Sequence, residues 1–203
     1  ILSEVPEMFG AETILMNRAQ DKETFQEIVN LINNFKDYFI SNDKVIYENP
    51  SPGNKEGGLT TLEEKSLGNI EKAGRAQVNG VNNYGDQIKG SGLQLLESPG
   101  NDLVSTTALT VAGAQIILFT TGRGTPFGAP VPTVKISTNS ELYRQKRNWI
   151  DFNAGQLLEN KSMEQLADDF FQYLMKVASG EEKAKNEIND CREIAMFKTG
   201  VTV

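Results

Sequence analysis

Two stretches of this sequence place ionisable side chains beside glycines, where they could take part in chemistry. In residues 49–65 the candidate acids and bases are Lys55, Glu56, Glu64 and Lys65. Carboxylates and lysines can transfer protons, and a cationic side chain can stabilise a developing negative charge. We therefore predict that these four residues are catalytic. The alternative is a capped, solvated first helical turn, because Thr60 and Thr61 each precede a glutamate by three residues.

The second stretch is residues 120–128, in which Arg123 stands between Gly122 and Gly124. Flanking glycines let the backbone approach a ligand, and a guanidinium group can hold a carboxylate through two hydrogen bonds. A structural ion pair explains such an arginine equally well. The predicted substrate-binding residues come from both stretches, with one from the turn at 98–101, and are Asn54, Gly57, Gly58, Thr61, Asn101, Thr121, Arg123 and Thr125.

The sequence contains no histidine. This excludes Ser-His and Cys-His nucleophiles, histidine acid–base chemistry and the usual zinc sites. Any metal held by this chain alone would have oxygen ligands, as Mg²⁺, Mn²⁺ and Ca²⁺ prefer. No individual metal ligand is predicted. Either the site uses carboxylates and lysines, or another part of the protein supplies the remaining groups.

Neither glycine-rich stretch has the spacing of a nucleotide-binding loop. The last glycine of residues 122–128 comes one position too late for G-x-G-x-x-G, and residues 53–58 lack the Gly-Lys-Ser/Thr ending of a P-loop. Helix N-termini behind such turns still offer free N–H groups, which suit a small anion. We therefore expect a carboxylate ligand rather than a dinucleotide or a triphosphate.

The composition narrows the partners. The 203 residues carry a net charge of −7 and no basic block, so we expect no nucleic-acid partner. No apolar run is long enough to span a membrane, and no signal peptide opens the sequence. The single Cys191 gives no disulfide framework and fits a reducing cytoplasm. Because the sequence begins inside an apolar, strand-like segment, we expect a fragment of a longer protein.

Apolar strand-like runs alternate with amphipathic helices, which predicts an α/β fold. We expect a three-layer architecture with helices on both faces of a mostly parallel sheet, Rossmann-like but without the dinucleotide fingerprint. The predicted strands lie near residues 1–5, 45–48, 93–97, 115–120 and 132–137. A single domain would cover residues 1–180, followed by a charged, solvated segment and a tail at 181–203.

The centre of the predicted domain is a βαβ unit over residues 93–128. A strand near 93–96, the turn Ser98-Pro99-Gly100, a helix opening at Asn101 and a doubly buried strand near 116–119 follow one another. If both strands belong to one sheet, the loops that follow them share its carboxyl edge, where α/β proteins bind ligands. We therefore predict that Arg123 lies near this turn.

Other patterns predict local structure. Apolar residues at helical spacing, Phe25 and Ile28 among them, predict a helix over 21–40, and Ser162 with Gln165 forms a capping box for a helix that ends at Gly180. The tetrapeptide Ser-Pro-Gly-Asn occurs at 51–54 and 98–101, and the two copies are either structural equivalents or a chance repeat. The glycine-spaced residues 74–92 predict a mobile loop.

Three runs carry a resemblance to a known family: residues 4–12, residues 49–68 and residues 119–128. They are similar to the altronate/galactarate dehydratase family of sugar-acid hydro-lyases, in its larger carboxyl-terminal part. The run 49–68 is the most specific of the three. The resemblance covers most of the chain up to Gly180. The family's small β-rich amino-terminal domain has no counterpart in this sequence.

This resemblance implies removal of water from a hexonic or hexaric acid to give a 2-keto-3-deoxy acid, as in an altronate-type enzyme. It implies a divalent metal, iron or manganese, whose site needs the missing part of the protein. It also implies a small-molecule sugar acid and the protein's own amino-terminal domain as partners, and it leaves a homo-oligomer open. Glu7 and Glu12, after the first strand, add further carboxylates.

Two functions remain open at this point. The chain is the catalytic portion of a sugar-acid dehydratase, or it is a non-catalytic α/β domain that binds a carboxylated ligand or mediates oligomer contacts. The density of ionisable residues in 49–65 favours the first. On that interpretation the isolated chain is expected to be nearly inactive.

Overall fold

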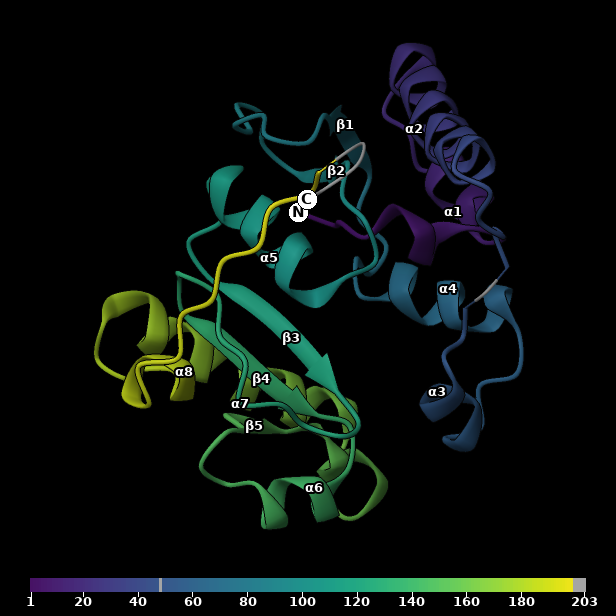
Figure 1. The fold of residues 1–203 in the computed structure, drawn as a ribbon. Coiled ribbons are helices and arrows are strands. Elements are labelled where there is room, and N and C mark those ends of the chain that lie inside the picture. The colour runs from purple at the N-terminus through teal and green to yellow at the C-terminus, as the bar shows by residue number, and fades with distance from the viewer. Residues whose placement is uncertain (48, 199–203) are drawn as a thin grey trace. The chain divides into compact units, whose positions relative to one another are not determined.

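The computed structural model describes residues 1–47 and 49–198 (Figure 1). The chain divides into two compact units. Unit 1 comprises residues 1–113 together with the end of the tail from Met196, and unit 2 comprises residues 114–195. Each unit has its own parallel sheet and its own helices, so each is described by itself.

The sheet of unit 1 is built around β2 (Leu93–Leu96), which pairs in parallel with β1 (Val78–Asn82). Leu2 forms a parallel bridge with Leu95 on the other side of β2, and Ala19 forms one with Val78. The predicted strand at 93–97 is confirmed. The predicted strand at 1–5 is reduced to the Leu2 bridge, because the chain turns at once into η1 (Val5–Met8).

Helices cover both faces of this sheet. The helices of unit 1 are α1 (Glu12–Met16), α2 (Lys22–Ser41), α3 (Pro52–Glu56), α4 (Leu62–Glu71) and α5 (Asp102–Val111), of which α3 buries none of its residues. On one face Leu95 joins a core that contains Ile28 and Phe35 of α2, and on the other Leu96 packs with Ala108 of α5. The α/β class with helices on both sides of a parallel sheet is therefore confirmed.

Unit 2 contains a second parallel sheet in the order β3 (Ile117–Thr121), β4 (Thr133–Ser137) and β5 (Phe152–Asn153). Its helices are α6 (Ser140–Gln145), η2 (Ala154–Leu158), α7 (Met163–Ser179) and α8 (Lys185–Ile188). Every residue of the central strand β4 is buried, and Val134 and Ile136 pack against Val177 of α7. The strand predicted at 132–137 is confirmed.

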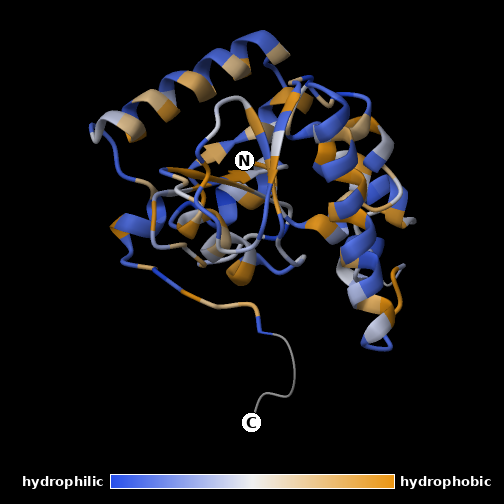
Figure 2. Ribbon diagram, turned by 90° about the horizontal axis from the view of Figure 1, so that it is seen from above, coloured by the Kyte–Doolittle hydropathy of each residue, from blue (hydrophilic) through white to orange (hydrophobic). Residues whose placement is uncertain are grey.

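Several helix boundaries follow from local capping. Asp21 accepts a hydrogen bond from the Thr24 N–H at the start of α2, and α7 begins with the predicted capping box. α7 ends at Gly180, whose φ of 76° lies in the left-handed region. Polar and apolar residues alternate along the helices (Figure 2). Among the described residues, none of the helices is long and apolar enough to cross a membrane.

The structure corrects the predicted βαβ unit. β2 and β3 lie in different sheets and in different units, so no single sheet joins them. β3 is an edge strand with alternating exposure, and Leu118 is 51% exposed, so the prediction of a strand buried on both faces was wrong. Periodicity finds an apolar strand but does not reveal which neighbour it will pair with.

Three other expectations were also wrong. Residues 45–47 form no strand, and residue 48 lies outside the described residues. Residues 74–92 contain β1 rather than only a loop. Phe25, expected on the buried face of α2, is 41% exposed. Of the two alternatives left open for the Ser-Pro-Gly-Asn copies, structural equivalence is excluded, because Pro52 begins a helix whereas the second copy ends at Asn101, the N-cap of α5.

The segment after Gly180 is only partly solvated, in contrast to the prediction. Asn186 in α8 is 1% exposed, and its amide oxygen accepts a hydrogen bond from the Thr133 N–H at 2.8 Å. The same amide donates to the carbonyl of Ala129 at 3.2 Å. Asn186 therefore fixes the start of β4. At the end of the described tail, the Phe197 N–H donates to the Tyr84 hydroxyl within unit 1.

Candidate active site

The carboxyl edge of the unit 1 sheet brings two chain exits together. The chain leaves the Leu2 bridge into η1 and leaves β2 into the turn at 98–100, and the Val5 N–H donates to the Ser98 carbonyl at 2.9 Å. α5 begins at the same edge, where the Asn101 side chain accepts from the Val104 N–H at 3.2 Å. Ligands of α/β proteins bind at such edges.

Five charged residues gather at this edge, and we name them the edge cluster: Glu4, Glu7, Lys65, Lys72 and Asp102. An ion pair in this cluster joins Lys65 Nζ to Glu7 Oε1 at 2.6 Å, with side chains 17% and 14% exposed. Lys65 also donates to the Asn49 side chain at 3.2 Å. Glu7 thus has a direct counter-ion, which lies on α4.

Glu4 has an unusual backbone. Its φ of 64° and ψ of 60° place it in the left-handed region, which costs a non-glycine residue about 1–2 kcal/mol. The hydrogen bond from the Glu7 N–H to the Glu4 carbonyl, at 2.8 Å, and that from Val5 to Ser98 hold this conformation on both sides. Within the described residues, no hydrogen bond to the Glu4 carboxylate is found. Such held conformations occur often at functional sites.

The edge cluster changes the acidity of its carboxyl groups. Burial and the charge of Glu7 raise the pKa of Glu4 to about 7, with Asp102 adding to the rise while Lys72 and Lys65 oppose it. The pKa of Asp102 is also raised, by burial and by Glu7. A carboxyl group with a pKa near neutrality can accept or donate a proton under working conditions. Glu4 is therefore suited to acid–base chemistry.

Of the four predicted catalytic residues, the structure brings Lys65 into the edge cluster. Glu64 instead caps α4, because its carboxylate accepts from the Thr60 N–H at 2.9 Å and from the Thr60 hydroxyl at 3.1 Å. The hydrogen bonds from Thr60 lower the pKa of Glu64. Lys55 and Glu56 are exposed on the short helix α3. These three side chains stand outside the cluster, and their catalytic role stays a prediction.

The predicted binding residues of unit 1 mostly shape the backbone. Thr61 accepts from the Glu64 N–H at 3.1 Å as the N-cap of α4, and Asn101 is the N-cap of α5. Asn54 donates to the Ser51 hydroxyl at 3.1 Å. Gly57 and Gly58 are exposed. The backbone at position 58 has a φ of +100°, which favours glycine over residues with a side chain.

The predicted binding residues of unit 2 form a loop that is held by its own side chains. Thr121 accepts from the Gly124 N–H at 2.9 Å, and Thr125 accepts from the Phe127 N–H at 3.2 Å. Arg123 is exposed, and its carbonyl accepts from Lys146 Nζ at 2.7 Å. Because Arg123 and Asn101 belong to different units, their convergence on one ligand stays a prediction.

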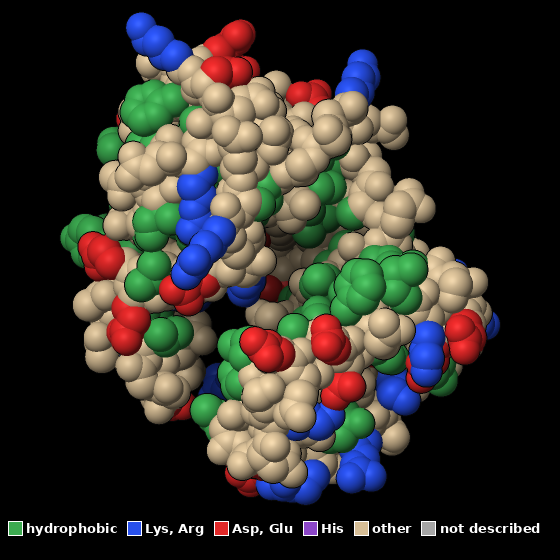
Figure 3. All heavy atoms as spheres, turned by 180° about the vertical axis from the view of Figure 1, so that it is seen from behind, with side chains coloured by type: hydrophobic (Ala, Val, Ile, Leu, Met, Phe, Trp, Pro, Cys, Tyr) green, Lys and Arg blue, Asp and Glu red, His purple; other side chains and the backbone are tan. Residues whose placement is uncertain are grey.

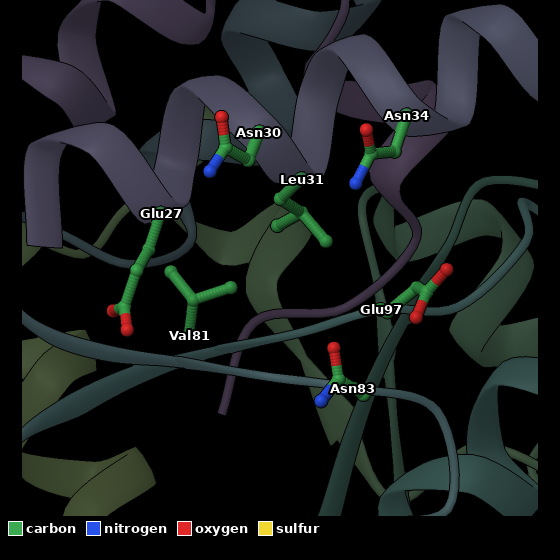
Figure 4. Close-up of a pocket in the computed structure, with 7 residues that line it drawn as sticks. All are labelled: Glu27, Asn30, Leu31, Asn34, Val81, Asn83 and Glu97. Atoms are coloured by element: carbon green, nitrogen blue, oxygen red, sulfur yellow. The ribbon is translucent and has the colours of Figure 1, made fainter.

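A polar groove of about 290 Å³ opens in unit 1. Its lining residues are Glu27, Asn30, Leu31, Asn34, Val81, Asn83 and Glu97 (Figure 4). Asn83 and Glu97 directly follow β1 and β2, so the groove lies at the carboxyl edge of the sheet and against α2. Amides and carboxylates above an apolar floor can bind hydroxyl groups.

Charges of both signs are mixed on one face of the molecule. On the face drawn in Figure 3, cationic and acidic side chains alternate and form no continuous basic area.

Comparison with known proteins gives the family. The model described as "D-galactarate/Altronate dehydratase, C-terminal" matches residues 1–202. The chain belongs to this family. It is 58% identical over 204 residues to the altronate dehydratase of Bacillus subtilis strain 168, and 56% identical over 203 residues to that of Escherichia coli strain K12. Each match covers 100% of this chain and 41% of the relative.

A more distant family relative is the galactarate dehydratase (L-threo-forming) of Escherichia coli strain K12. It is 34% identical over 185 residues, which are 90% of this chain and 35% of that protein. The chain therefore spans less than half the length of the curated relatives it matches.

Family membership raises the question of a divalent metal. Among the described residues, no group of three or more histidine, cysteine, aspartate or glutamate side chains is placed to hold a metal ion. In the edge cluster, Glu7 is engaged by Lys65 at 2.6 Å, which removes it as a simple metal ligand. These residues do not form a metal site by themselves, so no step of the chemistry below is assigned to a metal.

Sequence reasoning found Lys65 and Glu7 but missed Glu4, Lys72 and Asp102 as site residues. Glu4 lies in the family-like run 4–12, which was the available signal. Its left-handed backbone and its position beside Asp102 depend on contacts across about a hundred residues, and no local pattern reports them.

Proposed function

We propose that the complete protein carrying this chain is an altronate-type dehydratase, which removes water from a hexonic or hexaric acid to give a 2-keto-3-deoxy acid. The observation that carries this proposal is the identity of 58% and 56% to two altronate dehydratases over the whole chain, against 34% to a galactarate dehydratase. Because the match covers 41% of each of those relatives, the activity is proposed for the complete protein and not for this chain alone.

The reaction has three chemical needs. A base must take the proton next to the carboxylate, a cationic group must stabilise the enediolate that forms, and an acid must assist the departure of the hydroxyl on the next carbon. The edge cluster offers carboxyl groups with raised pKa values, Glu4 and Asp102, beside Lys65 and Lys72. It thus offers the acid–base groups that this chemistry uses.

The groove at the same sheet edge supports a hydroxylated substrate. Asn30 and Asn34 present amides from α2, while Glu27 and Glu97 present carboxylates (Figure 4). Such groups donate to and accept from the hydroxyls of a sugar-acid chain, whereas two carboxylates disfavour its charged end. We infer that the groove receives the neutral, hydroxylated part of the substrate.

We retain iron or manganese as a proposed cofactor, with ligands from parts of the protein beyond the described residues. Metal analysis of the purified complete protein, before and after a chelator, tests this. Loss of activity on chelation that is restored by iron or manganese alone would support it, and full activity in the metal-free protein would contradict it.

The function is tested with the purified complete protein on a panel of hexonic and hexaric acids, with iron or manganese added. We expect formation of a 2-keto-3-deoxy acid from altronate, detected by mass spectrometry as loss of one water. Galactarate should be a poorer substrate. If none of the acids is dehydrated while a carboxylated ligand still binds, a non-catalytic binding domain would explain the chain better.

A further inference from the structure

We propose that Glu4 is the base that removes the proton next to the substrate carboxylate, a role that rests on the proposed dehydratase function. The inference deepens that function because it assigns one step to one side chain. It starts from position: Glu4 lies between the Leu2 bridge and η1, at the carboxyl edge of the sheet.

The geometry sets Glu4 apart from the neighbouring carboxyl groups. Glu7 forms an ion pair with Lys65 at 2.6 Å, so its carboxylate is engaged by a direct partner. The Glu4 carboxylate has no such hydrogen bond among the described residues, although it is half-buried and its left-handed backbone is held on both sides. A fixed carboxylate with unused acceptor oxygens at a ligand-binding edge is what a base requires.

The charged groups that act on Glu4 come from three elements. Glu7 lies on η1, Lys65 and Lys72 belong to α4 and its C-cap, and Asp102 opens α5. Burial and the charges of the two acids raise the pKa of Glu4 to about 7, and the charges of the two lysines oppose this rise. The lysines can also stabilise the enediolate, whose added negative charge lies close to the base that forms it.

The proposed step balances without a further reactant. The C–H bond next to the substrate carboxylate breaks, its proton goes to a Glu4 carboxylate oxygen, and its electron pair forms the enediolate. When the neighbouring C–O bond breaks, those electrons form the C=C bond of an enol and hydroxide leaves. That hydroxide and the proton taken by Glu4 together make the water released, and the enol becomes the 2-keto acid.

The test compares two variants of the complete protein, Glu4→Gln and Glu71→Gln. Glu71 is an exposed carboxylate at the end of α4, in the same unit but outside the edge cluster, so it serves as the matched control. Loss of a general base typically costs 10²–10⁴-fold, so Glu4→Gln should lower kcat/KM by about 10²–10⁴-fold. Glu71→Gln should change it by less than about twofold.

Two further readouts separate a base from a structural residue. The wild-type kcat/KM should rise with pH through an ionisation near 7, and Glu4→Gln should lose that ionisation. In D₂O the wild type should exchange the substrate proton next to the carboxylate, and Glu4→Gln should not. If Glu4→Gln fails to fold, Glu4→Asp decides, because it keeps a carboxyl group and should keep the pH dependence at a lower rate.

Failure of the role proposed for Glu4 and failure of the proposed function give different results. An active wild type with Glu4→Gln within about threefold, or with an unchanged pH profile and exchange, overturns the role of Glu4 and leaves the proposed function standing. A Glu4→Asp protein as active as the wild type does the same. A wild-type protein that dehydrates no acid of the panel overturns the proposed function, and the role of Glu4 with it.

Discussion

The Lys65–Glu7 pair allows a prediction in which stability and activity move by calculable amounts. The two charged atoms lie 2.6 Å apart and the side chains are 17% and 14% exposed, so the pair is closer to a buried than to a surface one. Breaking a buried pair by removing one partner costs about 3–5 kcal/mol, against about 0–1 kcal/mol at the surface. We therefore expect Lys65→Met to lose about 2–4 kcal/mol of unfolding free energy.

The double variant Glu7→Gln, Lys65→Met should recover part of that loss, because no unpaired charge then remains. Equilibrium urea unfolding of the complete protein measures these differences, with Lys89→Met as a control for loss of an exposed lysine. The control should stay within about 0.5 kcal/mol. A loss below about 0.5 kcal/mol in Lys65→Met, or strictly additive effects in the double variant, would refute this reasoning.

The two single variants, Lys65→Met and Glu7→Gln, should shift the pH dependence of kcat/KM in opposite directions. Lys65 opposes the raised pKa of Glu4 whereas Glu7 contributes to it. Lys65→Met should therefore shift the ionisation in kcat/KM above about 7, and Glu7→Gln should shift it below. Shifts in one direction for both variants would show that the ionising group is not Glu4.

Four further outcomes are expected. Arg123→Lys should lower kcat/KM by about 30- to 150-fold if a bidentate carboxylate contact is lost, and a change under about threefold would leave Arg123 a structural residue. The isolated chain should dehydrate almost no altronate compared with the complete protein, and equal turnover by the two would contradict this. Because the folded pKa of Glu4, about 7, lies above the ordinary 4.5, its contribution to stability is present below pH 4.5 and lost as pH rises through 7. At about 1.4 kcal/mol per pH unit, the free energy of unfolding of Glu4→Gln, relative to that of the wild type, should rise by on the order of 3 kcal/mol between pH 4 and pH 8. A difference between the two urea midpoints that does not change with pH would contradict this. Asp151→Ala should cost about 2–4 kcal/mol, because its carboxylate accepts from the N–H groups of Lys135 and Lys185, both at 2.7 Å, and from the Tyr173 hydroxyl at 3.2 Å; an unchanged urea midpoint would show that water replaces these bonds.

Local sequence determined much of the secondary structure. The starts of α2, α4 and α5 follow from Asp21, Thr61 and Asn101, whose side chains accept hydrogen bonds from N–H groups three residues later. The left-handed Gly180 ends α7 as predicted. These features depend on neighbours within one helical turn, and such neighbours are visible in the sequence.

The pairing of strands needed the tertiary structure. β1 was hidden in a glycine-spaced segment, because its residues are only partly apolar and gain their pairing from β2. β2 and β3 both look like buried strands, yet they join different sheets. Strand pairing is a long-range choice among competing partners, so the pattern of one strand does not fix it.

The candidate site divides in the same way. The sequence alone determined the family and the absence of histidine, and it predicted carboxylate-and-lysine chemistry. Only the tertiary structure brought Glu4 together with Lys65 and Asp102, which lie 61 and 98 positions away. Burial and the charge of Glu7 then raised the pKa of Glu4. The physical reason is that an ionisation energy depends on distance and burial in the folded chain, and a linear sequence contains neither quantity.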